Sequence, residues 1–258
     1  MNLFGLHTAE LETLFLVWIR CSTIIMIMPI FGTTQIPAMA RVGLGLLISF
    51  VVYPTVHVIQ PLNDLGLLAV AILSQAIIGI LFGFVTQMVF MGVQFAGEII
   101  DIQIGFAVAS VINPASQQQV TIIGELQLAI ATLIFLVTDS HMLFFQGMRG
   151  SFNMLPLPWA TLTMATQNGV ITFFTQALLI VFSVSAPVAI TLFLVNIALA
   201  FLARVAPQMN IFVIGFPLQI TVGLIMLIIT LPLLGYALPN LFAQVPRQLD
   251  SLMRSMAT

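Results

Sequence analysis

Long apolar stretches with almost no charged side chains constrain this chain more than any other feature of its sequence. The stretch from Gly66 to Ile112 is nearly continuous, and only 5% of the 258 residues are charged, where about 25% is usual in soluble domains. A soluble fold needs polar side chains over its surface, yet 60% of this chain is apolar. The sequence therefore excludes a soluble globular enzyme. It predicts an integral membrane protein, or a chain that buries its surface against partners.

Six regions approach the roughly 20 apolar residues that a membrane-spanning helix needs, and they predict an all-α fold. These regions are 13–31, 42–60, 66–96, 120–138, 170–203 and 211–243. Prolines interrupt the last two regions, at Pro187 in one and at Pro217, Pro232 and Pro239 in the other. Because proline removes a helical hydrogen bond, we expect the second half of the chain to form broken helices packed against other protein.

The N-terminal region is predicted to be a retained helix rather than a cleaved signal peptide. The apolar run 14–31 is followed by a small-x-small triplet at 38–40, which has the shape of a cleavage site. However, Glu10 and Glu12 precede the run where a signal has positive charge, and Arg20 interrupts it. The two glutamates instead suit the positive end of a helix dipole.

The basic and reactive side chains argue against several kinds of site. All six basic residues are arginines and none are clustered, which argues against nucleic-acid binding, and a GxxxxGK[ST] phosphate loop is impossible without lysine. The single cysteine, Cys21, allows neither an internal disulfide nor a cysteine cluster for zinc. His7, His57 and His141 are isolated, and no HExxH, GxSxG or CxxC motif occurs. We predict no catalytic residue, no cofactor and no metal site.

A polar stripe follows one face of the third apolar region and its continuation to Asp101. Its members recur at spacings of three, four and seven residues, so they share one face of a helix. The stripe contains Gln87, Gln94, Glu98 and Asp101. Because a charged group at mid-bilayer costs at least about 2 kcal/mol, we expect this face to meet protein or water. A satisfied seam between helices is favoured over a water-filled path. Gly79 and Gly83 form a small-xxx-small pair that predicts a close helix approach.

Arg20 lies near the middle of the first apolar region, too deep for its guanidinium to reach a membrane surface easily. An arginine in that position is expected to pair with a carboxylate. The candidates are Glu98, Asp101 and Glu125, in the same chain or across a subunit boundary. We group Arg20 and these three carboxylates with Gln87 and Gln94 as a polar seam that serves assembly.

Three further segments lie between the apolar regions or overlap their ends. Segment 104–120, IGFAVASVINPASQQQV, is uncharged and carries the turn signal Asn113-Pro114, so it is either a plain connector or a loop that projects into a passage. Composition alone favours the connector. Segment 204–219, RVAPQMNIFVIGFPLQ, is expected to form a polar hairpin tip. The stretch 139–168 is expected to be a polar loop at the boundary between two halves.

Several of these segments resemble the FliR family of type III export-gate proteins and its virulence-secretion (SctT-type) relatives. The resemblance rests on segment 204–219, on GEIIDIQIGFA at 97–107 running on to Asn113-Pro114, and on residues 141–156, and it covers essentially the whole chain. Ile104 and Asn113 depart from the family, which often has methionine and aspartate there. The signature residues are Arg204, Pro207, Gln208, Asn210, Gly215, Phe216 and Pro217.

The resemblance implies a non-enzymatic subunit of the flagellar export gate. One copy would join FliP and FliQ in a helical assembly, with FlhB bound outside it and FlhA nearby. Unfolded flagellar subunits and membrane lipid are further implied partners. The single domain 1–258 would combine a FliP-like part at about 1–140 with a FliQ-like part at about 169–258. The implied location is the bacterial inner membrane, in the flagellar basal body, with broken helical hairpins largely on the periplasmic side.

The resemblance also implies a plug in the central channel, formed by the loop at about 106–119. Uncharged small residues and glutamines suit a passage that must not bind any one unfolded chain strongly. The implied plug residues are Phe106, Val108, Ser110, Val111, Ile112, Asn113, Pro114, Ala115, Ser116 and Gln117. The alternative function is a secondary transporter, because broken helices and buried carboxylates are typical of that class, although no inverted repeat is visible.

Overall fold

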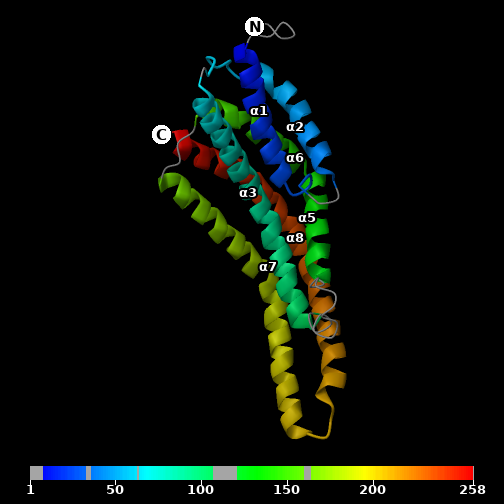
Figure 1. Ribbon diagram of the computed structural model, residues 1–258. Helices are drawn as coiled ribbons and strands as arrows, with labels where there is room; N and C mark the ends of the chain where they lie inside the picture. Colours follow the sequence, from blue (N-terminus) through cyan, green and yellow to red (C-terminus); the bar gives the residue numbers. More distant parts are fainter. Residues whose placement is uncertain (1–7, 33–35, 63, 107–120, 160–163, 258) are drawn as a thin grey trace. The chain divides into compact units, whose positions relative to one another are not determined.

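The computed structural model describes the chain except for residues 1–7, 33–35, 63, 107–120, 160–163 and 258. Every regular element in the described residues is helical, which confirms the predicted all-α fold (Figure 1). The elements in chain order are α1 (Thr8–Ile27), α2 (Ala38–Val52), the 3₁₀ turn η1 (Tyr53–Thr55), α3 (Leu65–Ile104), α5 (Ile122–Val137), α6 (Ser140–Met154), α7 (Met164–Val205) and α8 (Ile211–Ala257).

Helices α3, α7 and α8 are much longer than a single membrane crossing. They contain 40, 42 and 47 residues. At 1.5 Å per residue each is about 60–70 Å long, roughly twice the hydrocarbon thickness of a bilayer. Prolines end neither helix, since α7 continues through Pro187 and α8 through Pro217. One proline removes only one backbone hydrogen bond, and the turns on either side keep theirs.

A break between helices lies instead between α5, which ends at Val137, and α6, which begins at Ser140. Asp139 separates them in the left-handed conformation, with φ of 53°. The predicted polar loop at 139–168 was therefore wrong over α6. The polar residues of α6 cover only part of its surface, and the residues of its buried face recur at helical spacing. That face consists of Ser140, Phe144, Met148, Ser151 and Phe152.

The described chain forms two compact units. The first comprises residues 1–88, 139–174 and 242–258, and the second comprises 89–138 and 175–241. Helices α3, α7 and α8 each contribute to both units. The predicted FliP-like and FliQ-like parts concern similarity to other proteins rather than packing, so that division stays a prediction.

In the first unit, α1 lies beside α2 and α3 at close range. The indole of Trp18 donates a hydrogen bond to the carbonyl of Val42, 3.2 Å away. A Cβ on Gly79 would lie 3.0 Å from the carbonyl oxygen of Arg20, and one on Gly83 would lie 2.7 Å from the Cβ of Ile27. These distances confirm the close helix approach predicted from the small-xxx-small pair.

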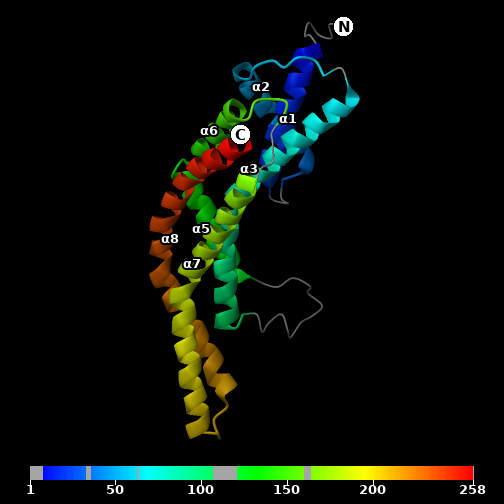
Figure 2. The ribbon, with the colours of Figure 1, turned by 90° about the vertical axis from the view of Figure 1, so that its left-hand side faces the viewer.

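The second unit contains the end of α3, α5 and the hairpin of α7 and α8. Figures 1 and 2 show α7 and α8 meeting at a turn, where Met209 donates its N–H to the carbonyl of Ala206, 3.1 Å away. This turn confirms the hairpin tip predicted within segment 204–219. The core of the unit is a cluster of buried aliphatic residues, namely Ile100, Ile104, Ile123, Val188, Leu192 and Leu227.

Four segments are long and apolar enough to cross a membrane, and the bent pair α5–α6 adds a fifth if it counts as one span. They are Ala38–Thr55, Leu65–Ile104, Gln167–Val205 and Val213–Arg254. Helix α1, which carries Glu10, Glu12 and Arg20, is not among them. No more than 28% of the most apolar window in any of the four is buried within the chain. These windows therefore leave exposed apolar side chains that lipid or partner chains can cover.

Candidate functional site

Arg20 is completely buried in the first unit, and its guanidinium donates to neutral oxygens. Nε donates to Oε1 of Gln75 at 2.7 Å, Nη1 to the carbonyl of Ser151 at 3.0 Å and Nη2 to the carbonyl of Leu155 at 2.9 Å. The ring of Phe152 lies 4.3 Å from the guanidinium carbon, within cation–π range. One arginine thereby joins α1 to α3 and to the end of α6.

The predicted pairing of Arg20 with a carboxylate is therefore wrong for the described chain. Ser151 and Leu155 carry carbonyls at the C-terminal end of α6, where the helix dipole places partial negative charge. This helix end and the amide of Gln75 occupy the positions expected for a carboxylate. Sequence reasoning missed Gln75 and Ser151. A polar residue inside an otherwise apolar stretch was the available signal for Gln75.

Asp101 is the one member of the predicted polar seam in the second unit whose side chain is buried, being 2% exposed. Oδ1 accepts the N–H of Ile123 at 3.0 Å, and Oδ2 accepts the N–H groups of Ile123 at 3.1 Å and Gly124 at 3.2 Å. These donors belong to the first turn of α5. The N–H groups in the first turn of a helix have no acceptor within that helix. Thr121, at the N-cap position, makes no side-chain cap. Asp101 of α3 therefore caps α5.

The C-terminal end of α3 forms a Schellman motif on the same residue. Gly105 adopts a left-handed conformation with φ of 96°. Its N–H approaches the carbonyl of Ile102 at 3.2 Å, and the N–H of Phe106 approaches the carbonyl of Asp101 at 3.0 Å. Asp101 thus contacts the residue before segment 107–120 through its carbonyl, and the helix after it through its carboxylate.

The signature segment divides between two places in the second unit. Arg204, Pro207, Gln208 and Asn210 are exposed at the hairpin tip between α7 and α8. Gly215, Phe216 and Pro217 lie in α8, and a Cβ on Gly105 would lie 3.3 Å from the ring of Phe216. The two quoted motifs, far apart in sequence, therefore meet at the turn that ends α3.

Asn196 and Gln219 form a polar contact between α7 and α8 beside this turn, with the amide nitrogen of Gln219 donating to the side-chain oxygen of Asn196. A hollow of about 250 Å³ opens there, lined by small and apolar side chains as well as by these two amides. The members nearest the signature are Ala200, Ala203, Gly215 and Phe216. The amide pair and the hollow therefore belong to the packing around the turn that ends α3. None of the residues that line the hollow is ionisable.

Comparison with known proteins agrees with the quoted motifs. Residues 11–245 match the family described as "Bacterial export proteins, family 1". The chain belongs to this family. It is 31% identical to the flagellar biosynthetic protein FliR of Bacillus subtilis strain 168 over 92% of this chain and 93% of that protein. It is 30% identical to FliR of Escherichia coli K12, over 88% and 87% of the two chains.

A relative from a virulence-secretion system also matches this chain. The Yop proteins translocation protein T of Yersinia pestis is 30% identical over 73% of this chain and 74% of that protein. The resemblance to FliR and to its virulence-secretion relatives, predicted from the motifs, is thereby confirmed.

The remaining members of the predicted polar seam are partly or fully exposed. In the second unit, Nε2 of Gln94 lies 3.5 Å from Oε1 of Glu125, which is exposed, and Glu98 is half-buried on the same face of α3. Gln87 belongs to the first unit and is half-buried. The structure therefore gathers Gln94, Glu98, Asp101 and Glu125 where α3 meets α5. A role of these residues in assembly stays a prediction.

Most of the implied plug lies outside the described residues. Phe106 is described and packs against the aliphatic core of the second unit. The implied plug residues beyond the description are Val108, Ser110, Val111, Ile112, Asn113, Pro114, Ala115, Ser116 and Gln117.

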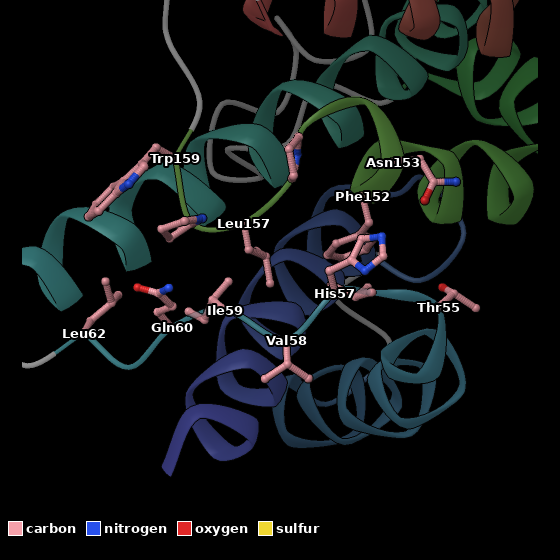
Figure 3. Close-up of a pocket in the computed structure, with 13 residues that line it drawn as sticks. Thr55, His57, Val58, Ile59, Gln60, Leu62, Phe152, Asn153, Leu157 and Trp159 are labelled. Atoms are coloured by element: carbon pink, nitrogen blue, oxygen red, sulfur yellow. The ribbon is translucent and has the colours of Figure 1, made fainter. Parts of the chain in front are cut away.

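A separate hollow of about 610 Å³ lies in the first unit, between residues 55–62 and the stretch after α6 (Figure 3). His57, Asn153 and Trp159 are among its lining residues. Within the described ranges, no group of three or more His, Cys, Asp or Glu side chains is placed to hold a metal ion. The lining contains no acid–base or metal-binding cluster that would identify a ligand.

Replacing Gly105 with alanine is expected to destabilise the protein by about 1–2 kcal/mol, because its left-handed backbone disfavours a Cβ. The new methyl group would also lie 3.3 Å from the ring of Phe216. Asparagine, which tolerates this conformation better, is expected to cost less. Thermal unfolding of the purified protein in detergent measures the difference, and equal melting of Gly105→Ala and wild type would contradict it.

Proposed function

We propose that this chain is a subunit of the flagellar type III protein export gate, where it forms part of the channel and carries the plug for unfolded flagellar subunits. Membership of an export-protein family, with FliR relatives matched over about nine-tenths of both chains, supports the export role. The FliR matches cover more of the chain than the Yersinia match does, which favours the flagellar system. The export role needs no cofactor and no catalytic residue of this chain.

The observation that best supports a plug is the geometry around Asp101. This residue contacts Phe106 before the segment and Ile123 after it, so the described residues on either side of segment 107–120 lie close together in the second unit. Flanking residues that lie close together are compatible with a loop that projects into a passage. Its sequence from Val108 to Gln119 has no charged residue, so it offers no fixed charge to trap an export substrate.

The helix dimensions support a hetero-oligomeric gate rather than a bundle surrounded by lipid alone. Helices of about 60–70 Å exceed the bilayer core by a factor of two, and no more than 28% of the most apolar window of each is buried within the chain. In the proposed gate FliP and FliQ cover this surface, FlhB binds outside and FlhA lies nearby. The proposed site is the inner membrane in the flagellar basal body, with much of the protein on the periplasmic side.

The division into a FliP-like part at 1–140 and a FliQ-like part at 169–258 belongs to the same proposal. The long hairpin of α7 and α8 lies almost wholly within the second part and supports it. A secondary transporter is less well supported. Asp101, the buried carboxylate, is already bonded to backbone N–H groups of α5 and is not available to a transported substrate.

Deleting residues 110–117 tests the plug. The assembled gate is expected to form as in wild type, but to conduct ions or leak small solutes in the closed state. The measurement is potassium conductance across a planar bilayer that contains the purified complex, with native mass confirming its composition. Replacing the same eight residues with glycine and serine retains the segment length and is expected to leak less than the deletion. An intact complex that stays sealed after the deletion would contradict the plug.

A further inference from the structure

The hollow of about 610 Å³ in the first unit lies between two irregular stretches of chain, residues 55–62 and the stretch after α6 (Figure 3). The buried guanidinium of Arg20 holds the second stretch through the carbonyl of Leu155. The buried amide of Gln75 adds a bond from Nε2 to the carbonyl of Pro158, 2.8 Å away. Two buried polar side chains, which are costly to remove from water, therefore fix this wall of the hollow.

The opposite wall, residues 55–62, is fixed from α1. The N–H of Ile59 donates to Oγ1 of Thr13 at 3.2 Å, and the N–H of Leu62 donates to Oε2 of Glu12 at 2.8 Å. Both walls are therefore held by side chains of other helices. A hollow whose walls are fixed in this way is a preformed binding site.

Residues 56–60 carry an open backbone edge along the hollow. They belong to no helix, and Val56 has extended angles, with φ of −104° and ψ of 137°. Because neighbouring N–H groups of an extended chain point to opposite sides, those of Val58 and Gln60 face away from α1, which binds the N–H of Ile59. Within the described residues, neither of these two groups has a hydrogen-bond partner. An edge of this kind pairs with an extended segment of another chain.

The side chains that line the hollow select an apolar segment. Most of them are aliphatic, aromatic or proline, and Val58 and Trp159 remain 51% and 42% exposed. Only His57 among the lining residues is ionisable. Aromatic side chains and an open backbone edge are features of grooves that bind extended peptides. A lipid chain would cover the apolar lining but would leave the N–H groups of Val58 and Gln60 unpaired.

Charge at one end of the hollow adds a further requirement. Glu12 binds the N–H of Leu62, and the exposed Asp64 follows two residues later. No lysine or arginine lines the hollow. A segment that carries a basic residue at this end is therefore complementary in charge.

We propose that this hollow is a docking site for an extended, mainly apolar segment of another gate subunit, which pairs with the backbone of residues 57–60 and places a basic residue near Asp64. The inference rests on the proposed function, because it takes the occupant to be a subunit of the same gate. A preformed apolar site suits a permanent neighbour, whereas an export substrate must be released.

Amide hydrogen exchange tests the docking, because it reports on the N–H groups themselves. The full chain alone in detergent is compared with its purified complex with FliP and FliQ in the same detergent. The N–H groups of Val58 and Gln60 are expected to exchange about tenfold more slowly in the complex. The N–H groups of Ile59 and Leu62 are the internal control, because they are already bonded within the chain and are expected to change less.

Filling the hollow provides a second test. Asn153→Trp adds an indole to the lining from an exposed position of α6. Gln146→Trp is the matched control, because it adds the same ring to the same face of α6 two turns earlier, outside the lining. Both variants are expected to melt like wild type, since both positions are exposed. Only Asn153→Trp is expected to return the exchange of Val58 and Gln60 in the complex to the rate of the chain alone.

Two further variants keep this test decisive. If Asn153→Trp does not fold, Trp159→Ala replaces it, because it removes an exposed aromatic anchor and is expected to weaken the protection of Val58. Asp64→Asn removes the charge and retains an oxygen for the N–H of Gly66, which Oδ1 accepts at 2.9 Å. This variant is expected to lower the protection as well. Equal protection in wild type, Asn153→Trp and Asp64→Asn would contradict the docking site.

The exchange rates also separate the docking site from the proposed function and from other occupants. Fast exchange in an intact complex would overturn the docking site and leave the export-gate function standing. A chain that does not copurify with FliP and FliQ would contradict the gate itself, and the docking with it. Slow exchange in the chain alone would show that this chain covers its own hollow. Slow exchange in nanodiscs of phosphatidylethanolamine and phosphatidylglycerol without partners would identify lipid as the occupant, and either result would overturn the inference.

Discussion

Replacing Arg20 with methionine is expected to destabilise the protein so strongly that little folded protein is found in the membrane fraction. The change leaves Oε1 of Gln75 and the carbonyl of Leu155 without the donor that they bond in the buried first unit. Each buried acceptor left unpaired costs about 1–3 kcal/mol, so the expected loss for the two is about 2–6 kcal/mol. That is a large part of the roughly 5–15 kcal/mol by which a protein is stable. Immunoblots of membranes and thermal unfolding in detergent measure it.

Two variants serve as controls for Arg20. Arg20→Lys keeps the charge but cannot reach all three acceptors from one ammonium, so it is expected to melt between wild type and Arg20→Met. Arg149→Met removes an exposed arginine from α6 and is expected to change stability by less than about 0.5 kcal/mol. Equal melting of Arg20→Met and Arg149→Met would show that the guanidinium contacts do not stabilise the fold.

Replacing Gly97 with alanine is expected to prevent α3 and α5 from packing as they do in the wild type. The added Cβ would lie 2.5 Å from the Cα and 2.6 Å from the nitrogen of Gly124, and neither backbone atom can move without moving its helix. Overpacking of this kind costs about 1–3 kcal/mol or more. Separation of the helices would also pull the N–H groups of Ile123 and Gly124 away from Asp101.

The glycines of the second unit provide a graded series for this prediction. A Cβ on Gly124 would lie 3.2 Å from the carbonyl oxygen of Gln94, so Gly124→Ala is expected to have an intermediate effect. A Cβ on Gly235 in α8 meets nothing within 4 Å, and alanine there is expected to stabilise the helix by up to about 1 kcal/mol. The unfolding midpoints of the three variants give the order. Equal midpoints for Gly97→Ala and Gly235→Ala would contradict the close contact.

The sequence predicted the long helices because apolar runs of this length have few alternatives. The regions around α3, α5, α7 and α8 were located by that argument. Helix α6 was missed because its mean hydropathy is low, and only the spacing of Phe144, Met148 and Phe152 indicates its buried face. Low hydropathy suggested a loop, whereas periodicity was the better guide.

The contacts of the candidate site were harder to predict than its helices. Arg20 and Asp101 were both selected from the sequence as buried charges that needed partners. Their partners are backbone groups at helix ends, the C-terminal end of α6 for Arg20 and the N-terminal end of α5 for Asp101. Local capping rules consider residues within one turn of a helix end, and these caps come from other helices. A rule based on side-chain pairing therefore selected the right residues and the wrong partners.

The interleaved composition of the first unit has a consequence for biosynthesis. Its first 88 residues are completed by residues 242–258, which include Leu252 packed close to Gly169. At roughly 5–20 residues per second, translation takes about 8–30 seconds to proceed from residue 88 to residue 242. During that interval the N-terminal helices exist without the segment that completes their packing. The nascent chain therefore depends on lipid or on a chaperone to cover them, and the unit folds to completion only after nearly the whole chain has been synthesised.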